Sequence, residues 1–90
     1  MVERGGTDLD HTLAERKTQH GAFSTHSVIE CELRSILERH GSKLGHSQKV
    51  AVGMIMHKLA RIMNGGHRHS DTWHDIAGYA ELIRRELLDE

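Results

Sequence analysis

The chain has 90 residues, of which 12 are basic and 13 acidic, with no proline and one cysteine. This length excludes more than one domain and leaves a thin core, because so short a chain buries only about 60–65% of the surface that its unfolded form exposes. The balanced charge does not favour nucleic acid or an anionic membrane as a partner, and Cys31 alone cannot form a disulfide within the chain. We therefore expect a cytoplasmic protein without a membrane segment that self-associates as a homodimer or larger homo-oligomer.

The composition indicates an all-α fold, since proline is absent and good helix formers such as Leu, Met, Ala, Glu and Arg are plentiful. Residues 1–8 contain a glycine pair and charges, and we interpret them as a flexible lead-in. The remainder, 9–90, is predicted to be a single helical domain. It opens with a short helix over 9–19 that Gly21 ends, and Phe23 then reaches the core from the following turn.

The next helix is predicted from the segment STHSVIECELRSILERHG. Ser24 or Thr25 is a suitable N-cap, and Gly41 is a suitable stop. Its apolar positions recur at helical spacing, at Ile29, Leu33, Ile36 and Leu37. This pattern predicts one long amphipathic helix.

Two further long helices follow. The first has Ser47 as its expected N-cap and ends at the pair that starts with Gly65; its apolar residues cover most directions, which predicts a central position. The second is capped by Ser70 or Asp71 and runs to about Leu88. The chain is thus predicted to be a small antiparallel helical bundle of three long helices plus a short N-terminal helix, completed by oligomerisation.

The last predicted helix has two distinct faces. At about 100° per residue, one face is an apolar stripe that we expect in the core. Its members are Trp73, Ile76, Ala77, Ala80, Ile83 and Leu87. The opposite face carries Asp71, Asp75, Gly78 and Leu82, with Tyr79 at its border. Because a glycine inside a helix costs about 1 kcal/mol relative to alanine, we expect a neighbouring helix, a partner subunit or a ligand to approach Gly78 closely.

The central helix carries basic residues that match this acidic face. His57, Lys58 and Arg61 interrupt an otherwise apolar helix, and cations that are partly buried need partners. One interpretation is an interhelical salt bridge to Asp71 or Asp75 that fixes the register. The other is a functional site in which Lys58 and Arg61 bind phosphates while the aspartates hold a metal ion or a base and ribose edge.

The segment MHKLARIMNGGHRHSDTWHDIAGYAELI, residues 56–83, resembles a small phage and prophage domain of unknown function. That domain has the pattern Lys-x-x-Arg-Ile, a short loop, and Asp-x-Trp-x-Asp-x-x-Gly-Tyr-Ala, and the upstream ERKTQHGAF resembles its first motif. The domain in turn is similar to the all-α MazG-like nucleoside triphosphate pyrophosphohydrolases. Such enzymes cleave nucleotides to a monophosphate and pyrophosphate with magnesium held on carboxylates from two helices.

This resemblance implies specific roles for individual residues. Asp71 and Asp75 match the second acidic helix of the MazG-like group, and are the implied catalytic residues and ligands of Mg²⁺. The implied contacts to a linear or cyclic phosphorylated nucleotide are His57, Lys58, Arg61, Tyr79, Arg16 and His20, with Tyr79 the stacking candidate. The chain departs from the group on the earlier helix, where a Glu-x-x-Glu pair is expected but Leu33 lies three residues after Glu30. Glu32 does not replace it, since residues two apart on a helix point about 200° from each other.

Three functional readings therefore remain open. The first is a metal-dependent pyrophosphohydrolase, and the second is a phage-type protein that sequesters a nucleotide signal of the host without cleaving it. The third is a structural oligomerisation module without a ligand. A separate alternative is a transition-metal site in the histidine-rich loop HRHSDTWHD, which brings His67, His69 and His74 close to the two aspartates.

Overall fold

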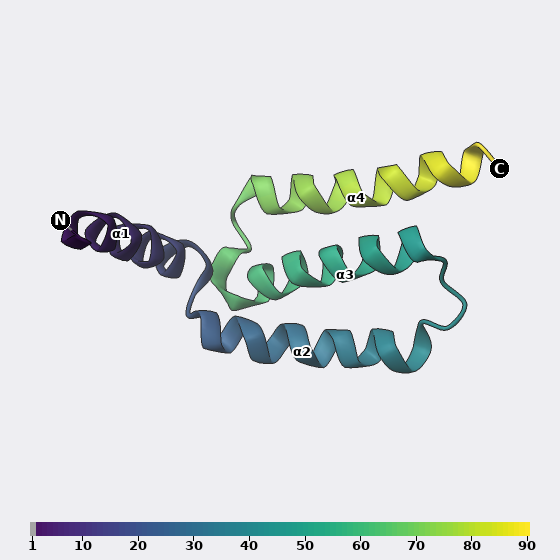
Figure 1. Ribbon diagram of the computed structural model, residues 1–90. Helices are drawn as coiled ribbons and strands as arrows, with labels where there is room; N and C mark the ends of the chain where they lie inside the picture. The colour runs from purple at the N-terminus through teal and green to yellow at the C-terminus, as the bar shows by residue number, and fades with distance from the viewer. Residues whose placement is uncertain (1) are drawn as a thin grey trace.

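The computed structural model describes residues 2–90, with the side chains of residues 8–17 and 21–90. The chain forms α1 (Val2–His20), α2 (Phe23–His40), α3 (His46–Arg61), the π-helical turn η1 (Ile62–Gly66) and α4 (Ser70–Leu88) (Figure 1). The described residues contain no strand, so the all-α prediction is confirmed.

Helices α2, α3 and α4 run antiparallel, with α3 between the other two (Figure 1). This confirms the predicted bundle of three long helices and the central place of α3. Helix α1 begins at Val2 rather than near residue 9, so it is longer than expected, and it extends away from the bundle. The Cα radius of gyration is therefore 16.1 Å, above the value of about 12 Å typical of a compact chain of this length. None of the helices in the described part of the chain is long and apolar enough to cross a membrane.

The end of α2 was predicted well and its beginning was not. Gly41 is the C-cap as expected, and its backbone N–H donates to the Leu37 carbonyl at 2.8 Å. The N-cap is Ala22 rather than Ser24 or Thr25. The helix starts earlier because the Asn64 side chain from η1 donates to the Ala22 carbonyl at 2.8 Å and fixes the turn there.

The predicted caps of α3 and α4 are also displaced by one or two residues. Gly45, not Ser47, precedes α3, and the Gln48 side chain accepts a hydrogen bond from the Gly45 N–H at 2.9 Å. His69, not Ser70 or Asp71, precedes α4. Both helices therefore begin at or before the residue whose side chain is the better cap, a displacement of the size that is usual at helix ends.

The core is as thin as the length predicts. Among the described residues the buried hydrophobic side chains are Ala51 and Ala60, both on α3. Gly53 is buried on the same helix. Small residues on the central helix let α2 and α4 approach its backbone closely, while larger apolar side chains fill the margins and remain partly exposed. Phe23, which was expected to reach the core, is 79% exposed and does not enter it.

The face that α4 turns towards the bundle agrees with the predicted stripe only at Ile76 and Ile83. Its inward positions are Thr72, Asp75, Ile76, Tyr79 and Ile83, whereas the exposed ones include Trp73, Ala77, Ala80 and Leu87. Trp73 is 51% exposed, and its Nε1 donates to the His67 carbonyl at 2.9 Å. The helix is rotated because Lys58 on α3 needs a carboxylate, which Asp75 supplies, and because the indole N–H already has a partner in the preceding loop.

Gly78 consequently faces outward. A Cβ atom at this position would have no described atom within 4 Å, so the expected close approach does not come from a helix of the same chain. Gly78→Ala is therefore expected to raise the free energy of unfolding by about 1 kcal/mol, through better helix propensity and a less flexible unfolded chain. Urea denaturation measures this change. A decrease would instead show that another molecule packs against Gly78.

Candidate functional site

One carboxylate, Glu30 on α2, receives hydrogen bonds from three side chains, and these four residues are called the Glu30 cluster. His26 and Arg34 lie one turn before and one turn after it on the same helix; Nε2 of His26 is 2.8 Å from Glu30 Oε1, and Nε of Arg34 is 2.8 Å from Oε2. His57 comes from α3, and its Nδ1 is 2.6 Å from Glu30 Oε1. The cluster thus joins two helices through a single charged group.

The hydrogen bonds keep Glu30 ionised. Its side chain is only 17% exposed, and this burial by itself raises its pKa, but the hydrogen bonds from Arg34, His26 and His57 outweigh burial and lower the pKa from its ordinary value of 4.5 to about 2. The rings of His26 and His57 meet edge to face, with centroids 4.8 Å apart. One carboxylate oxygen therefore faces two imidazole nitrogens near neutral pH.

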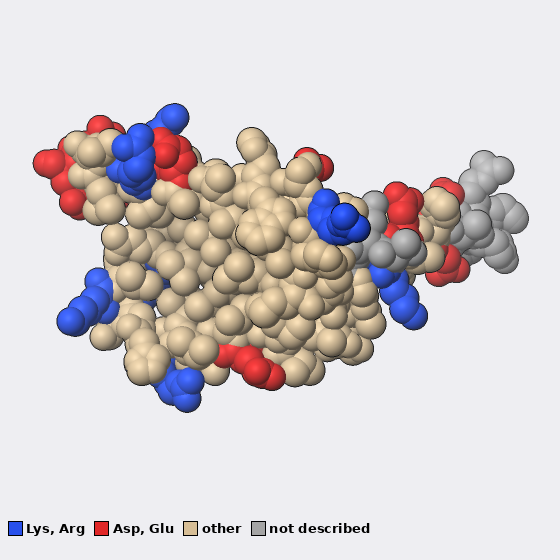
Figure 2. Space-filling view, turned by 180° about the vertical axis from the view of Figure 1, so that it is seen from behind, with Lys and Arg blue, Asp and Glu red and all other residues tan. Residues whose placement is uncertain are grey.

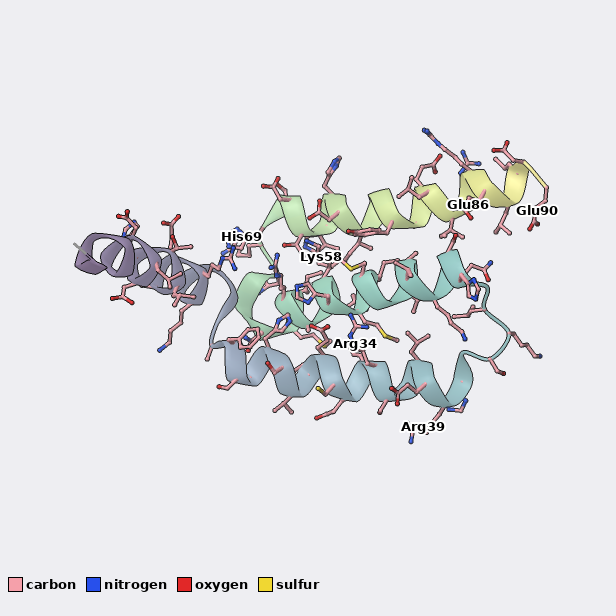
Figure 3. The ribbon with its side chains drawn as sticks, in the orientation of Figure 1. Arg34, Arg39, Lys58, His69, Glu86 and Glu90 are labelled. Carbon is pink, nitrogen blue, oxygen red and sulfur yellow. The ribbon has the colours of Figure 1, made fainter. Side chains whose placement is uncertain are left out.

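Arg34 connects the cluster to the backbone of α3. It points from α2 towards α3 in Figure 3, and its Nη2 donates to the Gly53 carbonyl at 3.3 Å. A Cβ at Gly53 would come within 3.0 Å of the Arg34 guanidinium, so a glycine at this position leaves room for the arginine. The orientation of the Glu30 carboxylate is in this way fixed from both helices.

A cavity of about 540 Å³ lies beside the cluster, between the last turns of α1, the start of α2 and the end of α3. We call it the basic pocket. Its lining residues are Leu13, Arg16, Lys17, Gly21, Ala22, Phe23, His26, His57 and Arg61. Three of them are cations, two are imidazoles, and none is acidic. Phe23 adds an exposed aromatic ring that stacks on His26, with centroids 6.1 Å apart and planes 9° from parallel.

The structure divides the predicted site residues between two places. Arg16, His57 and Arg61 line the basic pocket together. Lys58 instead points between α3 and α4, where its Nζ is 2.8 Å from Asp75 Oδ2 (Figure 3). This is the interhelical salt bridge that was one of the two interpretations of the basic residues on α3.

The other predicted residues lie outside the pocket lining. Asp71 is exposed at the start of α4, and Tyr79 is half-buried on its inward face. The side chain of His20 lies outside the described residues. Among the described residues, the side chains that lie close enough together to hold a metal ion are His26, Glu30 and His57. This group does not contain the aspartates expected to bind magnesium.

Five residues to which the site gives a role were not predicted: Lys17 and Phe23 as pocket residues, and His26, Glu30 and Arg34. A signal was present, because His26, Glu30 and Arg34 recur every four residues and so share one helix face. A second acid three residues after Glu30 is absent, whereas a base and a cation, His26 and Arg34, lie four residues before and after it.

The Lys58–Asp75 pair makes stability depend on pH. The hydrogen bond from Lys58 lowers the pKa of Asp75 below its ordinary value of 3.8, so the pair stabilises the fold above that pH and ceases to do so as the pH falls through the folded pKa. We expect Asp75→Asn to be less stable than the native chain at pH 7, and the difference to shrink towards pH 3. Urea denaturation at both pH values measures it. Asp71→Asn, an exposed change in the first turn of the same helix, breaks no salt bridge and is expected to lose only the smaller interaction of its carboxylate with the helix dipole.

Comparison with known proteins finds one family and one phage relative for the chain. No solved structure matches it. The chain is 49% identical over 43 residues to the Gene 55 protein of Mycobacterium phage L5, a match that covers 48% of this chain and 27% of that protein. The chain thus matches about a quarter of the length of this relative. The family described as a domain of unknown function, DUF6378, matches residues 9–86. These findings confirm the resemblance to a domain of unknown function with a phage relative, and the chain belongs to the DUF6378 family.

Proposed function

We propose that the chain is a phage-type nucleotide-binding protein that holds a phosphorylated nucleotide in the basic pocket. The observation that carries this proposal is the composition of the pocket: three cations and an exposed aromatic ring around a volume of about 540 Å³, without a carboxylate in the lining. Sites for small ligands in proteins span about 300–1,000 Å³, so a mononucleotide fits the available space.

Each part of a nucleotide has a matching group in the pocket. Arg16 and Arg61 present guanidinium groups that bind phosphate oxygens in pairs, and Lys17 adds a third positive charge. Phe23 offers a face on which a base stacks, a role that its 79% exposure allows and that the sequence suggested for Tyr79. Both linear and cyclic nucleotides carry phosphates and a base that match these groups.

We further propose that the nucleotide is held intact. In this proposal the chain shares a nucleotide pocket between helices with the MazG-like pyrophosphohydrolases, but not their hydrolysis reaction. Hydrolysis with Mg²⁺ on Asp71 and Asp75 requires both carboxylates to face the bound phosphates. Asp75 is engaged by Lys58, and Asp71 is exposed outside the lining. This arrangement supports sequestration over catalysis.

The experiment is a retention assay. Purified chain is incubated with nucleoside triphosphates and cyclic oligonucleotides, with and without Mg²⁺, then filtered and heated, and the released nucleotide is quantified. We expect one class of nucleotide to disappear from the filtrate and to return intact after heating. Release as a monophosphate plus pyrophosphate would replace sequestration with hydrolysis, and retention of no nucleotide would refute the proposal.

Matched variants locate the site. Arg61→Gln and Phe23→Ala are expected to weaken binding by about 10- to 100-fold, the equivalent of one charge-assisted hydrogen bond or one stacked base. Arg39→Gln makes the same charge change at the far end of α2, where the side chain points away from the bundle, and is expected to bind normally (Figure 3). Equal losses in Arg61→Gln and Arg39→Gln would show that only overall charge matters.

A second candidate function, a homo-oligomerisation module, is favoured by the apolar surface of α4. Leu82 is exposed on the same side of this helix as Gly78, whereas the exposed Trp73, Leu87 and Leu88 lie on another side. Figure 2 shows that the centre of one face of the bundle lacks charged side chains. A second copy of the chain that packs on the side of Gly78 would cover Leu82. If it does, Gly78→Leu, which adds bulk to the outer face of α4, is expected to dissociate the oligomer in analytical ultracentrifugation. A chain that sediments as a monomer throughout would exclude this candidate.

A further inference from the structure

The Glu30 cluster brings two imidazoles and one carboxylate to a common point. Nε2 of His26, Nδ1 of His57 and a Glu30 oxygen all lie within 4.8 Å of one another, and the two nitrogens are 2.8 and 2.6 Å from Oε1. Ligand atoms that surround one ion at about 2.0–2.2 Å stand about 3 Å apart, so small side-chain shifts suffice to admit an ion. We propose that His26, Glu30 and His57 bind a divalent first-row transition metal ion.

The donor set selects the class of ion. Two imidazole nitrogens with one carboxylate oxygen suit Zn²⁺, Fe²⁺, Co²⁺ or Ni²⁺, whereas Mg²⁺ and Ca²⁺ prefer oxygen donors alone. To coordinate the ion, each facing ring nitrogen offers its lone pair, and its proton moves to the other ring nitrogen or to solvent. This site is separate from the magnesium site expected on Asp71 and Asp75 and from the histidine-rich loop.

Neighbouring groups already orient the three ligands. Arg34 donates to Oε2 of Glu30 and to the Gly53 carbonyl, so it holds the carboxylate while leaving Oε1 directed at the two rings. The Phe23 ring lies nearly parallel to the His26 ring, with centroids 6.1 Å apart. Outer contacts of this kind position metal ligands and tune their affinity. Arg34 is accordingly a positioning residue, since it acts through Glu30.

The site is open on one side. Both His26 and His57 line the basic pocket, and the His57 side chain is 29% exposed. Three protein ligands with free positions towards a cavity are typical of ions that bind water or another small ligand, in contrast to closed four-ligand structural sites. The proposed ion binds without a nucleotide, so this inference does not depend on whether the chain binds and sequesters a nucleotide.

The test is equilibrium dialysis of the full chain against Zn²⁺, with bound metal counted by mass spectrometry. We expect one tight equivalent. Loss of an outer partner typically weakens metal binding about 10- to 100-fold, so Arg34→Lys is expected to weaken it about tenfold, and His57→Ala or Glu30→Gln by at least ~100-fold. The matched control combines His67→Ala, His69→Ala and His74→Ala; it removes the histidines of the segment HRHSDTWHD, two in the loop before α4 and His74 on α4, and is expected to retain the tight equivalent.

A second measurement uses the native chain, so it does not require that any variant folds. Zn²⁺ titrated into the native chain is expected to shift the NMR ring signals of His26 and His57 before those of His67 and His74. Circular dichroism confirms that each variant remains helical. Unchanged stoichiometry in the folded cluster variants, loss of the tight equivalent in the loop variant, or ring shifts confined to the loop would each overturn the proposal.

Discussion

Glu30→Gln is expected to lower the free energy of unfolding by about 2–3 kcal/mol in metal-free buffer at pH 7. The substitution removes an ionised acceptor that His26, Arg34 and His57 share, and the amide that replaces it has one acceptor oxygen and adds two donors. Hydrogen bonds to a charged group contribute about 1.5–3 kcal/mol each, and the partial exposure of the cluster reduces their sum. Urea denaturation with a chelator present measures the change.

Glu32→Gln is the matched control for this prediction. It removes the same charge two residues along α2, at an exposed position, and is expected to change stability by no more than about 0.5 kcal/mol. Comparable losses in both variants would mean that overall charge, rather than the Glu30 cluster, governs the stability of the α2–α3 pair.

The elements of the fold were predictable where a pattern within one helix determines them. Apolar residues around most of α3 indicated a central helix, and α3 does lie between α2 and α4. Gly41 ends α2 because the constraint is local: the backbone must turn after the last helical hydrogen bond, to Leu37. Helix starts were less predictable, since Asn64, 42 residues after Ala22, fixes the first turn of α2.

The rotation of α4 shows that the apolar pattern of one helix does not determine which face it buries. The stripe through Trp73 and Ala80 is the more apolar one, yet the helix turns Thr72 and Asp75 inward. A half-buried cation without a partner costs more than an exposed indole whose N–H is satisfied, so the needs of Lys58 on a neighbouring helix determine the orientation. Periodicity measures hydrophobicity along one helix and contains no information about that partner.

The candidate site was predicted only in part, because some of its contacts depend on residues from a neighbouring helix. His57 and Arg61 were identified as basic residues on an apolar helix and Arg16 through the resemblance, and all three meet in the basic pocket. The ladder of His26, Glu30 and Arg34 was visible as a four-residue spacing, but its meaning depends on His57, which comes from another helix. Only the packing of α2 on α3 gives that spacing a chemical role.

Gly21→Ala is expected to lower the free energy of unfolding by about 2–4 kcal/mol. Gly21 has a φ of +78°, a conformation that costs other residues about 1–2 kcal/mol, and a Cβ there would overlap the Asn64 backbone carbonyl oxygen. Relieving that overlap moves η1 away from the junction between α1 and α2, where Asn64 holds the Ala22 carbonyl. Urea denaturation measures the loss.

The same change is expected to weaken nucleotide retention, because Leu13, Arg16 and Lys17 reach the basic pocket only through the turn at Gly21. Gly78→Ala is the matched control: it adds the same methyl group to an outward-facing helical glycine, so its effect on stability has the opposite sign and retention stays unchanged. If Gly21→Ala destabilises the chain but retention persists in the fraction that remains folded, α1 contributes nothing to the ligand, and the phosphate contacts must come from Arg61 and the imidazoles of α2 and α3.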